Sequence, residues 1–148
     1  MLSKIAGLFS RRAFNIHSLA VGVTEDPEVS CMTIVVDGGD DMVEQVEKQL
    51  AKLIGVLRVK TLSPGEYISK ELVFIKVPAD AETRSQIIEI AKIFGARVVE
   101  VSLNSLILEY ADTGERIAEF EGMLSPYGRC EVVRTGQIAI EKDAVMAK

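Results

Sequence analysis

Few side chains in this sequence could act directly on a substrate. The chain has one histidine, His17, and two cysteines, Cys31 and Cys130, far apart in the sequence. A metal site needs several such ligands close together, and this set does not supply them. A cysteine–histidine pair would require Cys31 to approach His17 across a hairpin, and no third orienting group stands out. We therefore interpret His17 as structural and both cysteines as buried, reduced thiols.

Other catalytic patterns are equally missing from the sequence. It contains no phosphate-binding loop, no G-x-G-x-x-G and no G-x-S-x-G. The acidic pairs Glu25-Asp26 and Asp40-Asp41 stand in predicted turns, where solvated carboxylates are expected. Arg12 and Asn15 could begin an acylphosphatase-like phosphate site, but its glycine-rich cradle does not occur. A net charge of −5 also argues against a nucleic-acid binder, which usually carries a basic patch.

The best candidate for binding a small ligand is a corner near the start of the chain. Apolar residues from Leu2 to Phe9 recur every three or four positions, which predicts an amphipathic helix. The period then changes, and Ile16–Val23 alternates as a strand does. The corner between them is Ala13-Phe14-Asn15. Asn15 tolerates left-handed backbone and offers both a donor and an acceptor, so this corner could hold a small polar ligand.

The elements around this corner predict the first half of an α+β fold. After the opening helix we expect two strands, a helix and a third strand, at Ile16–Val23, Val29–Val36, Asp41–Ile54 and Val56–Leu62. This order is βαββαβ, the ferredoxin-like order, without its first strand. The missing strand would lie inside the sheet, so its neighbours would lose backbone partners. We therefore expect a truncated or misassigned start, or a sheet completed in another way.

The second half predicts a complete βαββαβ unit. Its expected elements are Lys70–Val77, Ala81–Phe94, Ala96–Val101, Ser105–Ala111, Glu115–Leu124 and Cys130–Arg134. We thus expect two tandem ferredoxin-like domains, 1–62 and 70–148, joined by a linker at 63–69. Asp112-Thr113-Gly114 is best explained as a helix-starting turn. Arg134-Thr135-Gly136 could equally be a salt-linked turn or a contact with a partner.

The opening stretch LSKIAGLFSRRAFNIHSL, followed by Thr24-Glu25-Asp26-Pro27, resembles the small regulatory subunit of acetolactate synthase (acetohydroxyacid synthase). The later stretches LEYADTGERIAEF, LSPYG and VVRTGQIAI are similar to the same family, so the resemblance covers nearly all of the chain. It implies that the first domain is an ACT domain, a ligand-binding version of the ferredoxin-like fold. One departure is that the family's first strand and its Asn-x-x-Gly turn do not precede Leu2 here.

The resemblance also implies a function without catalysis by this chain. Small subunits of this family pair through their ACT domains and dock on a catalytic subunit that carries thiamine diphosphate, Mg²⁺ and FAD. They raise its activity and confer feedback inhibition in branched-chain amino acid synthesis, chiefly by valine. The effector pocket implied here takes Asn15 and Ile16 from one subunit and Leu2 and Ser3 from the other. Because the upstream turn is missing, we expect the 148-residue chain to bind valine weakly.

Two further interpretations remain open from the sequence. The chain could be an ACT-type amino-acid sensor for a different enzyme, which copurification would reveal. It could also be the ligand-binding module of a transcription regulator, although no helix-turn-helix is visible. No apolar run approaches the roughly 18 residues of a spanning helix, and no basic segment precedes an apolar one. We therefore expect a soluble, cytoplasmic protein.

Overall fold

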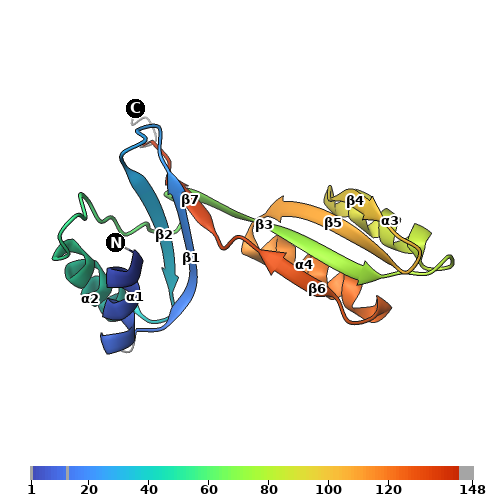
Figure 1. Ribbon diagram of the computed structural model, residues 1–148, viewed down its shortest axis with the longest axis horizontal. Coiled ribbons are helices and arrows are strands. Elements are labelled where there is room, and N and C mark those ends of the chain that lie inside the picture. Colours follow the sequence, from blue (N-terminus) through green and yellow to red (C-terminus); the bar gives the residue numbers. More distant parts are fainter. Residues whose placement is uncertain (1, 13, 144–148) are drawn as a thin grey trace. The chain divides into compact units, whose positions relative to one another are not determined.

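The computed structural model describes residues 2–12 and 14–143. Ala13 of the predicted corner and the last five residues of the predicted second domain lie outside the described residues. The chain forms two compact units (Figure 1). Unit 1 contains the described residues up to Ile68 together with the segment that starts at Ala139, and unit 2 is Ser69–Ile138.

Unit 1 begins with a helix, a hairpin and a second helix, as the sequence predicts. Its elements are α1 (Leu2–Arg12), β1 (Ile16–Val23), β2 (Ser30–Val36) and α2 (Asp40–Ala51). The two strands pair antiparallel, with Ile16 opposite Val36 at one end and Val23 opposite Ser30 at the other. Both helices lie on the same side of this hairpin (Figure 1). The start of β1 at Ile16 agrees with the change from helical to alternating spacing after the corner, whereas α2 ends at Ala51, before the predicted Ile54.

The core of unit 1 forms where the two helices meet the hairpin. Its buried members are Ile5, Leu8, Phe9, Val46 and Leu50. The spacing of three and four places Ile5, Leu8 and Phe9 on one face of α1. Half-buried side chains from β1 and β2 pack against this cluster, including Ile16 and Ile34. The hydrophobic faces inferred from the sequence are therefore the ones that fold together.

The predicted strand at residues 56–62 is wrong: no strand forms there. Val59 packs, half-buried, against the unit 1 core, and Lys60 forms an ion pair with Glu141. The alternation indicates only which side chains face inward. A strand also needs a neighbour for its backbone groups, and the sheet of unit 1 contains only β1 and β2 among the described residues.

Unit 2 carries the larger sheet. Its chain order is β3 (Tyr67–Pro78), α3 (Arg84–Phe94), β4 (Arg97–Val101), β5 (Ser105–Asp112), α4 (Gly114–Leu124), a 3₁₀ turn (Ser125–Tyr127) and β6 (Glu131–Arg134). The strands lie in the order β4-β5-β3-β6, and a short final strand, β7 (Ile138–Glu141), also pairs with β3. β3 starts inside the predicted linker 63–69, and β7 was not predicted. The remaining elements match the predicted βαββαβ order.

The core of unit 2 lies between one face of this sheet and the two helices. Val73, Ile75 and Val77 alternate along β3 and are almost completely buried. An aromatic cluster joins the helices to the sheet: the Phe120 ring lies 4.8 Å from that of Tyr110 and 5.0 Å from that of Phe94, measured between centroids. Aromatic side chains contribute large buried areas, so this cluster is a main source of stability.

Polar residues fix the starts of both helices in unit 2. The Asp80 carboxylate accepts hydrogen bonds from the backbone amides of Glu82 (2.9 Å) and Thr83 (2.8 Å), and these bonds hold the pKa of Asp80 below its usual value. The amides are thus held in turns, and α3 begins at Arg84 rather than at the predicted Ala81. The Thr113 hydroxyl accepts from the amide of Arg116 at 3.3 Å and caps α4. Asp112-Thr113-Gly114 is therefore a helix start.

Two further observations bear on the predictions. None of the described helices is long and apolar enough to span a membrane. Both cysteines are free thiols, but Cys31 is exposed and Cys130 only half-buried. The prediction that both are buried is wrong because Cys31 points away from the unit 1 core, on the side of the hairpin that the helices do not cover.

Candidate functional site

The candidate ligand corner is held by aromatic packing at the end of α1. The amide of Phe14 donates to the carbonyl of Phe9 at 3.1 Å, which ends the helix. The two rings pack edge to face with centroids 5.7 Å apart. Phe14 and Ile16 therefore turn toward the core, whereas Asn15 between them is exposed. The alternation of these three side chains presents the Asn15 amide to solvent at a fixed place.

Asn15 lies opposite Asp37 at the open end of the hairpin. The amide of Asp37 donates to the carbonyl of Asn15 at 3.0 Å and extends the β1–β2 pairing by one residue. Asn15 Nδ2 donates to the Asp37 carboxylate at 3.4 Å. This bond leaves Asn15 Oδ1 as an acceptor, next to a carboxylate. An ammonium group is the ligand group that matches two acceptors, one of them charged.

The other predicted site residues lie at the opposite end of α1. Leu2 and Ser3 form the first turn of this helix and are exposed. An 11-residue helix is about 16 Å long. Within one chain the structure therefore places Asn15 and Ile16 together but does not bring Leu2 and Ser3 to them. A pocket that uses all four residues requires two chains.

The structure also answers the question of a cysteine–histidine pair. Cys31 pairs with Gly22, which lies five residues along β1 from His17. At about 3.3 Å per residue, the two side chains are too far apart for proton transfer. Among the described residues, no three His, Cys, Asp or Glu side chains are grouped so that they could hold a metal ion.

Sequence reasoning missed two polar features of unit 1. Asp37 was not considered as a site residue, although the hairpin register places it beside Asn15. The available signal was that Asn15 immediately precedes β1 and Asp37 immediately follows β2. Ser18 was also missed: its hydroxyl oxygen is buried and has no hydrogen-bond partner among the described residues. Ser18 lies two residues after Ile16 on β1, and Asp37 directly follows Val36, the partner of Ile16 on β2.

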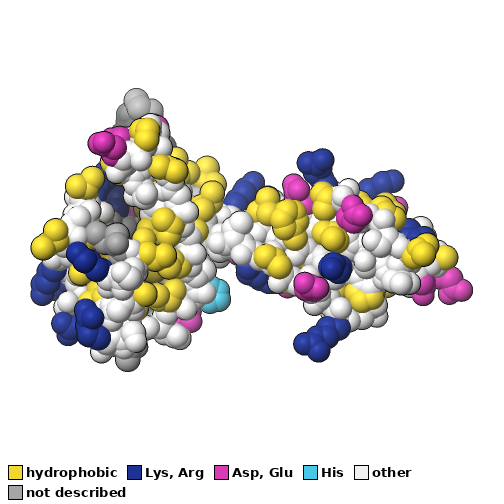
Figure 2. Space-filling view, in the orientation of Figure 1, with side chains coloured by type: hydrophobic (Ala, Val, Ile, Leu, Met, Phe, Trp, Pro, Cys, Tyr) yellow, Lys and Arg dark blue, Asp and Glu magenta, His cyan; other side chains and the backbone are white. Residues whose placement is uncertain are grey.

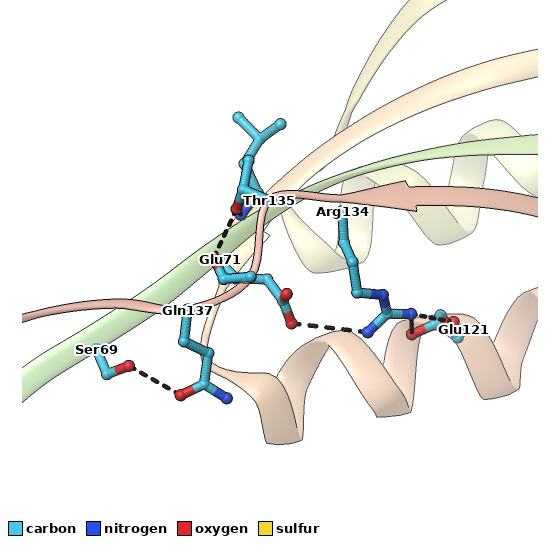
Figure 3. Close-up of polar contacts among 8 residues, drawn as sticks. Ser69, Glu71, Glu121, Arg134, Thr135 and Gln137 are labelled. Carbon is cyan, nitrogen blue, oxygen red and sulfur yellow. Dashed lines mark hydrogen bonds and ion pairs between the residues drawn. The ribbon is translucent and has the colours of Figure 1, made fainter. Parts of the chain in front are cut away.

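A second polar cluster lies in unit 2 and explains Arg134 (Figure 3). Arg134 contacts the carboxylate of Glu121 on α4 with oxygens at 3.0 and 3.1 Å, and that of Glu71 on β3 at 3.7 Å. Glu71 is only 7% exposed. Nearby, Ser69 donates to Gln137 at 3.0 Å and Thr135 bonds to the backbone of Leu72. Of the two interpretations of Arg134-Thr135-Gly136, the structure supports the salt-linked turn.

Known proteins resemble this chain along nearly its whole length. Residues 70–143 match the family described as the small subunit of acetolactate synthase, and residues 1–58 match the AHAS small subunit-like ACT domain. This chain belongs to the acetolactate synthase small-subunit family. The resemblance inferred from the opening stretch is thereby confirmed, as is a mixed α+β fold of two βαββαβ-like units with an ACT-like first unit.

Individual members of this family are similar to this chain along most of their length. The acetolactate synthase small subunit of Mycolicibacterium smegmatis is 45% identical over 96% of this chain and 84% of its own length. The probable small subunit of Archaeoglobus fulgidus is 44% identical over 95% of this chain and 87% of its own. The crystal structure of the Thermotoga maritima small subunit superimposes with a TM-score of 0.88 at 34% identity, covering 97% of this chain and 90% of that one.

Proposed function

We propose that this chain is the non-catalytic, regulatory subunit of an acetolactate synthase. It binds the catalytic subunit, raises its activity and makes it sensitive to a branched-chain amino acid, chiefly valine. The observation that carries this proposal is family membership across both units in the family's order. Thiamine diphosphate, Mg²⁺ and FAD belong in this proposal to the catalytic partner, and the complex works in the cytoplasm.

The corner at Asn15 supports the effector part of the proposal. An amino acid offers an ammonium, a carboxylate and an apolar side chain. The Asn15 amide oxygen and the Asp37 carboxylate suit the ammonium, and Ile16 adds apolar surface beside them. The first turn of α1 from a second chain, at Leu2 and Ser3, carries free backbone amides that suit the carboxylate. The effector therefore binds between two ACT units of a homodimer.

Reconstitution tests the activating role. The purified chain is mixed with the catalytic subunit of the same organism, and acetolactate formation from pyruvate is measured with the cofactors present. We expect no turnover by the chain alone and a higher rate in the mixture than with the catalytic subunit alone. The control is the heat-denatured chain. Turnover by the isolated chain, or an unchanged rate in the mixture, would contradict the proposal.

Calorimetry with valine tests the effector site on three proteins: the 148-residue chain, the same chain extended upstream by the family's first strand and turn, and the extended Asn15→Ala variant. We expect weak binding to the first and clear binding to the second. Binding to the third should be reduced by about tenfold or more, because one hydrogen-bond partner of a bound polar group is lost. Tight, Asn15-dependent binding to the 148-residue chain would show that the pocket is completed in another way.

A further inference from the structure

The single histidine of the chain lies two residues from Asn15 and shares its side of the hairpin. Phe14 and Ile16 turn toward the unit 1 core, so the alternation places the side chains of Asn15 and His17 on the opposite, exposed side. Figure 2 shows this histidine on the surface of unit 1 with an acidic side chain beside it. The imidazole ring is therefore open to solvent next to the candidate effector corner.

An irregularity in the hairpin fixes where His17 stands. Ile16 lies opposite Val36 and Ser18 lies opposite Val35, so His17 between them has no partner on β2. This is a β-bulge, in which one extra residue bends its strand and changes the direction of a side chain. Because the pairing on both sides of the bulge holds the backbone, the ring stays near the corner although no described residue bonds to it.

The register brings His17 close to the carboxylate of the corner. The backbone amide of Asp37 bonds to the carbonyl of Asn15, which makes His17 the diagonal neighbour of Asp37 on the exposed side. Diagonal neighbours in an antiparallel pair lie about 7–8 Å apart, within reach of long side chains. A protonated imidazole at this place attracts the Asp37 carboxylate and repels an ammonium group that binds there.

His17 is also the residue of this corner whose charge can change near neutral pH. β2 carries no charged residue. The charged residues closest along the chain on the two helices are Arg11 and Arg12 at the end of α1 and Asp40 and Asp41 at the start of α2. Arginine and aspartate ordinarily keep their charge between about pH 5.5 and 7.5, whereas histidine ordinarily titrates within this range.

We propose that His17 makes effector binding depend on pH through its effect on Asp37. The neutral imidazole leaves the Asp37 carboxylate and Asn15 Oδ1 available to the ammonium group of the effector. The protonated imidazole opposes that group and competes for the carboxylate. Binding of an amino acid therefore favours the neutral ring and releases protons, as linkage requires. This inference rests on the proposed effector site and names a residue that regulates it.

Calorimetry with valine on the upstream-extended chain tests the role of His17. In low salt, the affinity near pH 5.5 should be about threefold to tenfold lower than near pH 7.5. His17→Gln, which stays neutral, should bind equally well at both pH values. His17→Lys, which stays charged, should bind weakly at both. A pH dependence that persists in His17→Gln, or normal affinity of His17→Lys, would overturn the proposal.

Two further measurements separate this role from other causes. Adding Val23→His to His17→Gln places a histidine at the far end of β1, where Val23 is 69% exposed, and should not restore the pH dependence. Calorimetry near pH 6.5 in two buffers of different ionisation enthalpy should show proton release by the extended chain and none by His17→Gln. Equal proton release by both would overturn the inference alone. Absence of valine binding at every pH would overturn the proposed effector site as well.

Discussion

Asn15 and Asp37 are joined by two hydrogen bonds, one between backbones at 3.0 Å and one between side chains at 3.4 Å. The side-chain bond orients the Asn15 amide, so that Oδ1 is free to accept. Asp37→Ala should therefore raise the valine concentration needed for half-saturation of the upstream-extended chain several-fold, with little change in stability because both side chains are exposed. Calorimetry measures the affinity, and Asp41→Ala is the control. An unchanged affinity would mean that Asp37 does not position Asn15.

Arg134 forms an ion pair with the buried Glu71. We therefore expect substitutions at these two positions to have coupled effects on the free energy of unfolding. Arg134→Met leaves a carboxylate that is 7% exposed without its cation, and should cost about 2 kcal/mol of the free energy of unfolding. Adding Glu71→Met should recover part of this loss, because the buried carboxylate is then removed, whereas Glu121, the other partner of Arg134, is 31% exposed and stays in contact with water. Urea denaturation of the single and double variants measures the coupling. Arg97→Met, at an exposed pair 4.0 Å apart, should change little. Additive losses in the double variant would contradict the coupling.

Two glycines of the same unit should respond in opposite directions to alanine. Gly128 has φ +134°, and a Cβ there would lie 3.0 Å from Cγ of Pro78. Gly128→Ala should therefore destabilise by about 1–3 kcal/mol. Gly122 lies within α4, and a Cβ added to it would meet no atom within 4 Å, so Gly122→Ala should stabilise by about 0.5–1 kcal/mol. Thermal or urea unfolding of both variants provides the comparison, and a shift in the same direction for both would contradict it.

The hydrogen bonds to the Asp80 carboxylate should make the stability of unit 2 depend on pH. Its carboxylate accepts two backbone amides, so its pKa in the folded protein lies below the usual 3.8. The contribution of the charged form is complete above the unfolded pKa and is lost as the pH falls through the lower folded pKa. The stability difference between the unchanged chain and Asp80→Asn should therefore be largest near pH 6 and shrink below pH 4. Urea unfolding at several pH values tests this, and a constant difference would rule it out.

Unit 2 should fold without unit 1. All buried members of its core lie between Val73 and Leu124, so removing unit 1 takes none of them away. The fragment Ser69–Ile138 should give one cooperative calorimetric transition, although a domain of this size is only marginally stable. In the same fragment Phe120→Ala should abolish the transition or strongly lower its midpoint temperature, since it removes a side chain with 0% exposure. A non-cooperative melt of the unaltered fragment would indicate that the units stabilise each other.

The predictable parts of this fold are those that depend on local spacing. The face of α1 with Ile5, Leu8 and Phe9 follows from the sequence because the spacing that defines it lies within one helix. Residues 56–62 alternate equally well, yet they form no strand, because pairing depends on a neighbour distant in the chain. The link of Asn15 to Asp37 was missed for the same reason. It appears only once the register of the hairpin is known.

Ser69 and Gln137, joined at 3.0 Å, stand next to the two peptide bonds where the chain enters and leaves unit 2. Unit 2 is therefore an insertion whose entry and exit adjoin, and the chain returns afterwards to unit 1. We therefore expect that such a segment can be exchanged between related proteins as one piece. Transplanting it between relatives requires only two junctions that meet at one place, and circular permutation could join its ends with a short peptide.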